Sequence, residues 1–271
     1  MDGECIGKGR TAEVIRYDAH QALKLFSLGT DESVVRREFE CALFAWTHKV
    51  STPKPVSMVH RDARPGIVYE CVNGSSLLSQ LSNNPLLLSA TAREMAFLHY
   101  NVHSIECTEN LPRQKKNIEQ AIMAAPHISG EQKKAIASYL DSLPEANMLC
   151  HGDFHPDNIL KDSNAFIIDW MTGCAGNPLC DVARSVLLLE TSEIPDSVSF
   201  AMRYLLRFGQ RKLARAYLAS YCALSGTSER DIRRWLLPLY AARLVEDLSE
   251  GETRLILNRI QKETRIRGLL T

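Results

Sequence analysis

The chain has 271 residues, and 32 Lys and Arg side chains balance 32 Asp and Glu side chains, so its formal net charge is zero. This length suits one large domain or two modest ones, each with a hydrophobic core. A neutral chain creates no global field that attracts nucleic acid or an anionic membrane, so any recognition by charge must be local. We expect no nucleic-acid partner and no membrane partner, and the sequence leaves the oligomeric state open.

The eight cysteines are scattered, without a C-x-x-C pair or the paired spacing of a metal site. Several lie within apolar runs, as buried reduced thiols do, which favours a reducing compartment. The acidic start, Met1–Glu4, lacks the basic and apolar regions of a signal peptide. The uncharged stretch Cys71–Ala92 is rich in Ser, Asn and Gln, which argues against a membrane span. These features together predict a cytoplasmic protein.

Short apolar runs alternate with turn residues over residues 3–28, which predicts three antiparallel strands. The first two strands are joined by a hairpin that contains Gly7 and Gly9. Glycines at a hairpin tip let backbone N–H groups approach phosphates, so both are candidate nucleotide contacts. An ordinary hairpin turn explains the same pair, and the glycines alone do not decide between the two interpretations.

A helix is predicted over residues 31–46, where apolar side chains recur at helical spacing and Asp31 or Thr30 can serve as the N-cap. Residues 66–72 then predict another strand, closed by Asn73 and Gly74. From Leu77 onward the pattern is mainly helical, with a loop at 149–158 and a short strand at 165–169 as the main exceptions. We therefore expect an α+β chain with a sheet-rich domain over residues 1–72 and a larger, mainly helical domain over residues 73–271.

A candidate site loop has the sequence His151-Gly152-Asp153-Phe154-His155-Pro156-Asp157-Asn158. An apolar strand follows it and ends in Asp169, eleven residues after Asn158. Phosphoryl transfer requires positioning and charge neutralisation more than covalent chemistry. Asp153 is suited to accept the proton of an attacking hydroxyl as a general base. Asn158 and Asp169 offer the oxygen ligands that Mg²⁺ prefers. Taken singly each residue is weak evidence, but the combination predicts a phosphoryl-transfer site.

Lys24 lies in the middle of a predicted strand, between Leu23 and Leu25. Strict alternation allows it to point outward from an edge strand. A functional lysine would instead face the cleft and neutralise nucleotide phosphates. Two acids on the predicted helix, Glu38 and Glu40, compete as its partner; Glu40 is displaced from Glu38 by about 200° around the helix. Glu38 shares a face with the apolar residues, so we predict the pair Lys24–Glu38.

The chain resembles the aminoglycoside phosphotransferase and choline kinase superfamily, small-molecule kinases with a protein-kinase-like fold of two lobes. The resemblance covers about residues 3 to 190, with the motifs in family order and spacing. It is carried by His151–Asn158, by Ile168-Asp169-Trp170 and by Gly176-Asn177-Pro178-Leu179-Cys180-Asp181-Val182-Ala183. Weaker matches are Gly7 with Gly9, Lys24, Glu38 and Tyr69–Gly74.

The resemblance implies a small antiparallel-sheet N-lobe that clamps the nucleotide and a larger helical C-lobe that carries catalysis and the acceptor. It implies Asp153 as catalytic base, and Asn158 with Asp169 as Mg²⁺ ligands. Lys24 and Glu38 would hold the phosphates of ATP, or of GTP in its place. The backbone of Glu70, Cys71 and Val72 would form the adenine-binding hinge, and His151 with Asp181 would support the catalytic loop.

Asp169 is followed by Trp170-Met171, where protein kinases have Phe-Gly. The short span from Asp169 to Pro178 also leaves little room for an activation loop. Both departures favour a small-molecule acceptor over a protein substrate. We therefore expect transfer of the γ-phosphate to a hydroxyl of a small molecule, such as an aminoglycoside or a metabolite alcohol.

Two charged groups point to opposite kinds of acceptor. The acids Glu246, Asp247, Glu250 and Glu252 would suit a cationic acceptor, although such a run is more often a solvated helix face. Four arginines recur every four residues on a probable helix, at Arg203, Arg207, Arg211 and Arg215. Like charges at this spacing destabilise a helix by about 0.2–0.5 kcal/mol per pair, so we expect partners for them, either protein acids or an anionic substrate.

Two other functions compete with the kinase interpretation. The first alternative is a metal-dependent hydrolase. It rests on four potential metal ligands at every second position, which would share one face of a regular strand: His151, Asp153, His155 and Asp157. Gly152 and Pro156 make such a regular strand doubtful. A non-catalytic pseudokinase is the second alternative; it would lack at least one residue of the catalytic set, and none is missing.

Overall fold

The computed structural model describes residues 4–9, 11–108, 111–192, 194 and 198–269. They form two compact units. The first unit comprises Met1–Pro85 and Pro156–Gly173, and the second comprises Leu86–His155 and Cys174–Thr271. In the described part of the chain, no helix is both long enough and apolar enough to cross a membrane.

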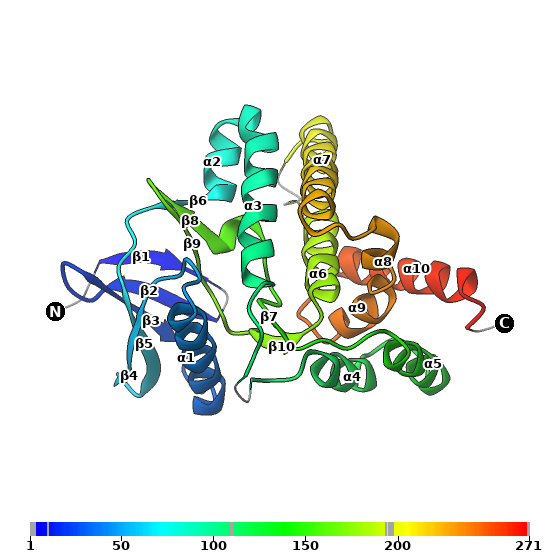
Figure 1. The fold of residues 1–271 in the computed structure, drawn as a ribbon, viewed down its shortest axis with the longest axis horizontal. Helices are drawn as coiled ribbons and strands as arrows, with labels where there is room; N and C mark the ends of the chain where they lie inside the picture. Colours follow the sequence, from blue (N-terminus) through cyan, green and yellow to red (C-terminus); the bar gives the residue numbers. More distant parts are fainter. Residues whose placement is uncertain (1–3, 10, 109–110, 193, 195–197, 270–271) are drawn as a thin grey trace. The chain divides into compact units, whose positions relative to one another are not determined.

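An antiparallel sheet of five strands dominates the first unit (Figure 1). In spatial order its strands are β1 (Cys5–Lys8), β2 (Ala12–Arg16), β3 (Gln21–Phe26), β5 (Arg64–Glu70) and β4 (Pro55–Arg61). The first three confirm the strands and the glycine-containing hairpin predicted for residues 3–28. β5 confirms the strand predicted at 66–72, although it begins and ends two residues earlier. β4 was not predicted.

Helix α1 (Glu32–Thr47) confirms the helix predicted over residues 31–46. Its N-cap is Asp31, whose side chain accepts a hydrogen bond from the Ser33 N–H at 2.7 Å. Of the two N-caps that the sequence allows, the structure therefore uses Asp31 and not Thr30. A carboxylate at this position also interacts favourably with the positive end of the helix dipole.

The two faces of the sheet bury different side chains, because successive residues of a strand point to opposite sides. On one face, Phe26 and Ile67 pack with Val35 of α1, and all three are fully buried. On the other face, Leu23 and Leu25 belong to a second buried cluster. Helix α1 thus covers the sheet face to which Lys24 also belongs.

A second, smaller sheet brings a later part of the chain into the first unit. Its strands are β6 (Ser75–Ser76), β8 (Ile159–Lys161) and β9 (Ala165–Ile167). The 3₁₀ turn η2 (Pro156–Asn158) precedes β8, and helix α2 (Leu77–Asn83) follows β6. Since β8 pairs with both neighbours, the segment 156–173 groups with the N-terminal residues, and the units differ from a single division between residues 72 and 73.

The second unit is mainly helical, as the sequence predicted. Its helices are α3 (Leu88–Val102), α4 (Gln114–Ala124), α5 (Gly130–Asp141), α6 (Pro178–Thr191), α7 (Phe200–Ser225), α8 (Glu229–Arg233), α9 (Leu236–Arg243) and α10 (Glu250–Ile266). A short 3₁₀ segment, η1 (Pro85–Leu87), precedes α3. Helices α3 and α6 both lie beside the long helix α7 (Figure 1).

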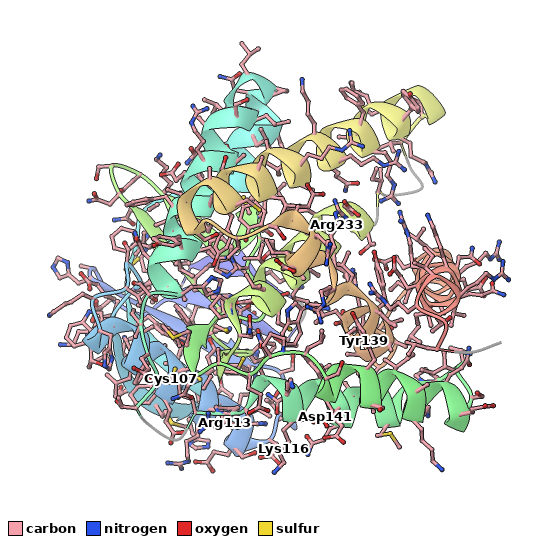
Figure 2. The ribbon with its side chains drawn as sticks, turned by 45° about the vertical axis from the view of Figure 1, so that its right-hand side comes forward. Cys107, Arg113, Lys116, Tyr139, Asp141 and Arg233 are labelled. Carbon is pink, nitrogen blue, oxygen red and sulfur yellow. The ribbon has the colours of Figure 1, made fainter. Side chains whose placement is uncertain are left out.

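Two short strands, β7 (Met148–Cys150) and β10 (Cys174–Gly176), pair in antiparallel fashion at the base of α3 and α6. Neither was predicted. Figure 2 labels Tyr139 on α5 in the same unit. Its hydroxyl donates to the carbonyl oxygen of Arg234 at 3.1 Å. Strand β7 leads directly into the His151–Asn158 loop, so the loop begins from a fixed point in the fold.

Candidate active site

Lys24 lies on β3, a central strand with β2 on one side and β5 on the other. Its Nζ is 2.8 and 2.9 Å from the two carboxylate oxygens of Glu38 on α1. The Tyr69 hydroxyl donates to the same carboxylate at 3.1 Å. Glu38 is fully buried, whereas Glu40 is exposed. The predicted pairing of Lys24 with Glu38 and not with Glu40 is confirmed, and Tyr69 is a positioning residue that the sequence did not reveal.

Asp169 is the second partner of Lys24. Its Oδ1 lies 2.9 Å from Lys24 Nζ, so one ammonium group bridges two carboxylates. Burial alone lowers the pKa of a lysine, but Glu38 and Asp169 together outweigh it and raise the Lys24 pKa above its ordinary value. Lys24 is therefore charged at neutral pH. Asp169 has a left-handed backbone (φ 67°), an uncommon conformation for a residue other than glycine.

Asn158 lies beside Asp169 in the first unit because strands β8 and β9 pair directly after η2. The carbonyl oxygen of Asn158 accepts a hydrogen bond from the Ile168 N–H at 3.0 Å. Asn158 is buried, and the Asp169 side chain is 33% exposed. One amide oxygen and one carboxylate form the kind of hard oxygen set that suits Mg²⁺. Lys24 shows that a cation is already stabilised next to Asp169.

Some backbone N–H groups expected to bind the nucleotide, in the hairpin with Gly7 and Gly9 and in the segment Glu70–Val72, are engaged by the protein itself. The Gly9 N–H donates to the Ala12 carbonyl within the hairpin at 2.8 Å, which engages it in the turn. Gly7 lies in the β1–β2 ladder opposite Val14. The Cys71 N–H donates to the His20 carbonyl at 2.8 Å, so adenine would have to use another main-chain group of the segment Glu70–Val72.

In the second unit, Asp181 organises the start of the loop that begins at His151. Its carboxylate accepts hydrogen bonds from the backbone N–H groups of His151 (2.6 Å) and Gly152 (2.9 Å). Gly152 has φ 78°, a conformation that a residue with a Cβ adopts only with strain. Phe154 is fully buried and stacks on His99 with 4.0 Å between ring centroids. The loop around Asp153 is therefore held on both sides.

Two histidines of α3 complete the surroundings of Asp181. His99 Nε2 and His103 Nε2 lie 3.0 and 3.2 Å from Asp181 Oδ2. Their Nδ1 atoms lie 2.6 and 2.7 Å from the hydroxyl oxygens of Tyr217 and Tyr221 on α7. This spacing of four residues on both helices aligns two parallel Tyr–His pairs on one carboxylate. In the part of the chain that the structure describes, His99, His103 and Asp181 are also the one trio of potential metal-binding side chains with ligand atoms all within 4.8 Å.

The hydrogen bonds at Asp181 explain its ionisation. Burial raises the pKa of a carboxyl group, but His99, His103 and the hydrogen bonds hold the Asp181 pKa well below its ordinary value. Burial, with His103 adding to it, lowers the pKa of His99 from 6.5 to about 3 despite the neighbouring Asp181. A neutral imidazole and an ionised carboxylate are therefore the working states of His99 and Asp181 at neutral pH.

The low pKa of His99 predicts an acid-sensitive fold. As the pH falls below 6.5, the unfolded chain takes up this proton first, so the stabilising contribution is complete above pH 6.5 and is lost progressively toward pH 3. We expect His99 to lower the free energy of unfolding by about 2 kcal/mol between pH 7 and pH 5. Urea unfolding at both pH values measures this change. In His99→Gln the dependence on pH should be weaker by that amount, and an unchanged dependence would contradict the assignment.

The side chain of Asp153 faces two potential cations. His155 Nε2 is 3.4 Å from Asp153 Oδ2, and Arg184 Nη2 is 4.0 Å from Oδ1. Although burial raises the pKa of Asp153, the His155 hydrogen bond and the charges of His155 and Arg184 lower it to about 2. Asp153 is thus an ionised acceptor at any physiological pH. Arg184 was not predicted, because nothing in the sequence links it to a residue 31 positions earlier.

The acidic group of the C-terminal region is also paired with arginines. Glu246 Oε1 is 2.7 Å from Arg184 Nη2, and Glu246 Oε2 is 3.2 Å from Arg243 Nε. Arg243 Nη2 lies 3.2 Å from Glu252 Oε1, and Arg243 also donates to the Thr191 hydroxyl. Two of the four acids therefore belong to a partly buried network of ion pairs and not to a solvated face.

The four arginines predicted on one helix do lie on α7, and the contacts of Arg207 with described residues are not the acidic partners that we expected. Arg207 donates to the Ser192 carbonyl at 2.8 Å and to the Gln210 side chain at 3.2 Å, both neutral acceptors. Arg211 and Arg215 are exposed. Solvent exposure lowers the repulsion between like charges enough for such a row to persist.

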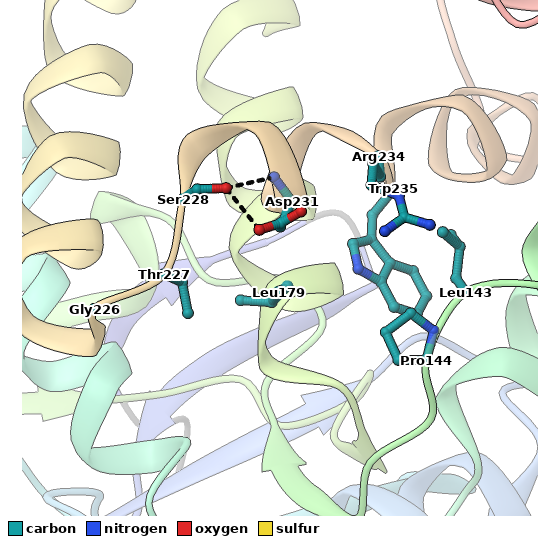
Figure 3. A pocket seen from close by; sticks show the side chains of 9 residues that line it. All are labelled: Leu143, Pro144, Leu179, Gly226, Thr227, Ser228, Asp231, Arg234 and Trp235. Carbon is teal, nitrogen blue, oxygen red and sulfur yellow. Dashed lines mark hydrogen bonds between the residues drawn. The ribbon is translucent and has the colours of Figure 1, made fainter.

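A hollow of about 430 Å³ in the second unit lies away from the predicted residues (Figure 3). Leu179 and Trp235 contribute to its apolar wall. Ser228 and Asp231, which also line it, hydrogen-bond to each other at 2.6 Å as part of the N-cap of α8. None of the predicted site residues lines this hollow, so we do not assign the active site to it.

Solved structures similar to this chain include phosphotransferases. An aminoglycoside-3'-phosphotransferase of type VIII has a TM-score of 0.62 at 18% identity, covering 89% of this chain and 91% of that one. The streptomycin–ATP complex of APH(2")-IIa has a TM-score of 0.61 at 16% identity, covering 97% and 91%. The macrolide 2'-phosphotransferase MphH from Brachybacterium faecium has a TM-score of 0.53 at 15% identity, covering 93% and 89%. At these identities the likeness establishes the shared fold.

No curated protein sequence matches the chain. The model of the phosphotransferase enzyme family, however, matches residues 6–237, which is most of its length. The match includes the segment from His151 to Asp169 and the segment around Asp181. It confirms the resemblance and the kinase-like fold that the motifs implied. The chain belongs to the phosphotransferase enzyme family.

Proposed function

We propose that this phosphotransferase transfers the γ-phosphate of ATP, or of GTP in its place, to a hydroxyl group of a small molecule such as an aminoglycoside or a metabolite alcohol. The observation that carries the proposal is the placement of Lys24, whose Nζ lies within 2.9 Å of both Glu38 and Asp169. An ammonium group held between two carboxylates is poised to bind phosphate oxygens on one side of a divalent cation.

Asp153 is the proposed base. Its carboxylate is ionised, because its pKa is about 2, so it can accept the hydrogen bond of an acceptor hydroxyl and orient the oxygen for attack. A carboxylate of such low pKa is a weak base, and it takes the proton late, as bond formation to phosphorus advances. This order suits the loose transition state of phosphoryl transfer, in which positioning matters more than early deprotonation.

Asn158 and Asp169 are the proposed Mg²⁺ ligands. The donor set fits, since both residues lie in one unit and offer hard oxygen atoms after the β8–β9 pairing. Mg²⁺ bound there would neutralise charge on the nucleotide phosphates. Lys24 would exchange its contact with Asp169 for contacts with phosphate oxygens while keeping Glu38, which Tyr69 holds in place. Gly7, Gly9 and the backbone of Glu70–Val72 remain proposed contacts of the nucleotide.

Several of the similar structures are complexes with ATP or ADP and with streptomycin or gentamicin. These complexes support nucleotide use and a small hydroxylated acceptor. The hydrolase alternative is weaker, because it requires the alternating residues from His151 to Asp157 to form a metal site. Among the described residues, the potential ligands that lie close together are instead His99, His103 and Asp181. A cytosolic location is part of the proposal, since all eight cysteines are free thiols.

Nucleotide binding tests the first half of the proposal. We expect Mg-ATP to raise the melting temperature of the wild-type protein and Lys24→Met to weaken Mg-ATP affinity by at least about 10-fold, through loss of charged hydrogen bonds to phosphate. Lys54→Met is the matched control, because Lys54 is exposed and packs over Trp46 instead of pairing with an acid. Equal affinities in both variants would contradict the role of Lys24, and parallel titrations with Mg-GTP compare the two donors.

A further inference from the structure

Arg184 places a permanent positive charge beside the proposed base. It lies on α6, one turn after Asp181, and its side chain is 16% exposed. Its Nη2 lies 4.0 Å from Asp153 and 2.7 Å from Glu246. A guanidinium does not lose its proton at any physiological pH. The position where an acceptor hydroxyl meets Asp153 is therefore next to a fixed cation.

Two of the four acids that could serve a cationic acceptor, Glu246 and Glu252, are already paired with arginines. Glu246 pairs with both Arg184 and Arg243, and Glu252 pairs with Arg243 at 3.2 Å. The Arg243 side chain is only 7% exposed and also donates to Thr191, so it is fixed in place. A polyamine could bind Glu246 only by displacing a buried arginine, and it would be repelled by the arginine that it displaced.

An anionic acceptor could bind Arg184 without displacing an ion pair. Among the described residues, neither ion pair of Arg184 uses Nη1 or Nε, so these N–H groups can donate to a ligand. The planar fork of a guanidinium matches carboxylate and phosphate oxygens in a bidentate arrangement. An anion bound at this edge would hold a neighbouring hydroxyl within reach of Asp153, which lies on the same guanidinium.

We propose, building on the phosphotransferase function above, that Arg184 determines acceptor choice by binding a carboxylate or phosphate group of the acceptor beside its reactive hydroxyl. Of the acceptors that the proposed function allows, Arg184 therefore selects an anionic hydroxy compound over a polycationic aminoglycoside. In the transfer, the hydroxyl oxygen forms a bond to the γ-phosphorus as its proton passes to Asp153. The bond from that phosphorus to the β-phosphate oxygen breaks, and the nucleoside diphosphate leaves.

Hydroxy compounds of different charge test this inference. The probes are glycerate and a sugar phosphate as anions, glycerol and a sugar alcohol as neutral compounds, and ethanolamine and kanamycin as cations. Release of ADP from Mg-ATP is measured for each acceptor. We expect the highest kcat/KM with an anionic probe. A cationic probe with the highest kcat/KM, or ADP release that no anionic probe accelerates, would overturn the inference while leaving nucleotide use intact.

Variants separate acceptor binding from a merely structural role. Arg184→Gln should raise KM for the anionic probe by about 10–100-fold, the size of a lost charged contact, and KM for the neutral probes by less than about threefold. A change in kcat through Asp153, which Arg184 also faces, should be the same for all probes. Arg184→Lys should restore part of the affinity, because it keeps the charge and loses the fork. Arg230→Gln, an exposed arginine of α8, is the control and should have no effect.

Glu246→Gln gives a second readout that does not depend on the folding of the Arg184 variants. Removing the competing carboxylate should lower KM for the anionic probe several-fold, an improvement that simple damage would not produce. A rise in KM for anionic and neutral probes alike would overturn the inference. If the wild-type protein neither binds nor hydrolyses Mg-ATP, the proposed function itself is wrong.

Discussion

Asp153→Asn should lower kcat for phosphoryl transfer by about 10²–10⁴-fold, the usual contribution of a positioned general base. The amide keeps the size of the side chain but removes the ionised acceptor that His155 and Arg184 stabilise. The nucleotide contacts assigned to Lys24, Asn158 and Asp169 are unchanged by this substitution. Steady-state kinetics for the acceptor and isothermal titration with Mg-ATP measure the two effects separately.

The control for this experiment is Asp141→Asn, an exposed aspartate at the end of α5, which should retain wild-type turnover. Asp153→Ala extends the test by removing the side chain altogether. If Asp153→Asn folds normally and keeps more than a tenth of the activity, Asp153 is not the base. If it folds normally but no longer binds Mg-ATP, the residue belongs to the nucleotide site.

Asp181→Asn should lower the free energy of unfolding by about 3–5 kcal/mol, as expected when one partner of a buried ionic network is removed. The carboxylate accepts hydrogen bonds from two backbone N–H groups of the catalytic loop and faces two histidines. An amide offers one acceptor oxygen and turns its NH₂ group toward those donors, which leaves buried polar groups unsatisfied. Urea unfolding at pH 7 measures the loss.

The same substitution should also reduce turnover, because the loop that carries Asp153 loses its anchor at His151 and Gly152. Asp141→Asn again serves as the control and should change stability by less than about 0.5 kcal/mol. A loss below about 1 kcal/mol in Asp181→Asn would mean that water or a rearranged loop replaces the carboxylate. Asp181 would then not be the organising residue.

The regular elements of the first unit were predictable because their signals are local. The exceptions are the short strands β6 and β8 and the longer strand β4. β4 ends at Arg61 and is joined to β5 by Asp62 and Ala63. Both turn residues have left-handed backbones (φ 52° and 60°), the conformation that two-residue hairpins require. Asn-Gly at this position would have indicated a hairpin, whereas Asp-Ala gives no such signal.

The site residues also divide into those with a local sequence signal and those without one. Glu38 was predicted over Glu40 because helical periodicity distinguishes the two faces of α1, and the structure pairs it with Lys24. Other contacts join residues far apart in the sequence, and no periodic pattern predicts them; they are made by Tyr69, Arg184 and Glu246. Their roles followed only from distances in the fold.

The acidic group and the arginine row show why charge patterns in a sequence do not specify a ligand. Glu246 and Glu252 looked available to a cationic acceptor, but Arg184 and the buried Arg243 pair with them. Arg207 looked in need of an acid and instead donates to a backbone carbonyl. The partner of a charged side chain depends on tertiary contacts, so the same composition suits opposite acceptors.

The most direct test of the account is ³¹P NMR of purified protein with Mg-ATP and a panel of anionic, neutral and cationic hydroxy compounds. The account predicts a new phosphomonoester signal that grows with ADP in equal amounts, requires one of the acceptors and is absent with Asp153→Asn. Inorganic phosphate as the sole new product with every acceptor, or no change in ATP, would contradict phosphoryl transfer to a small-molecule hydroxyl.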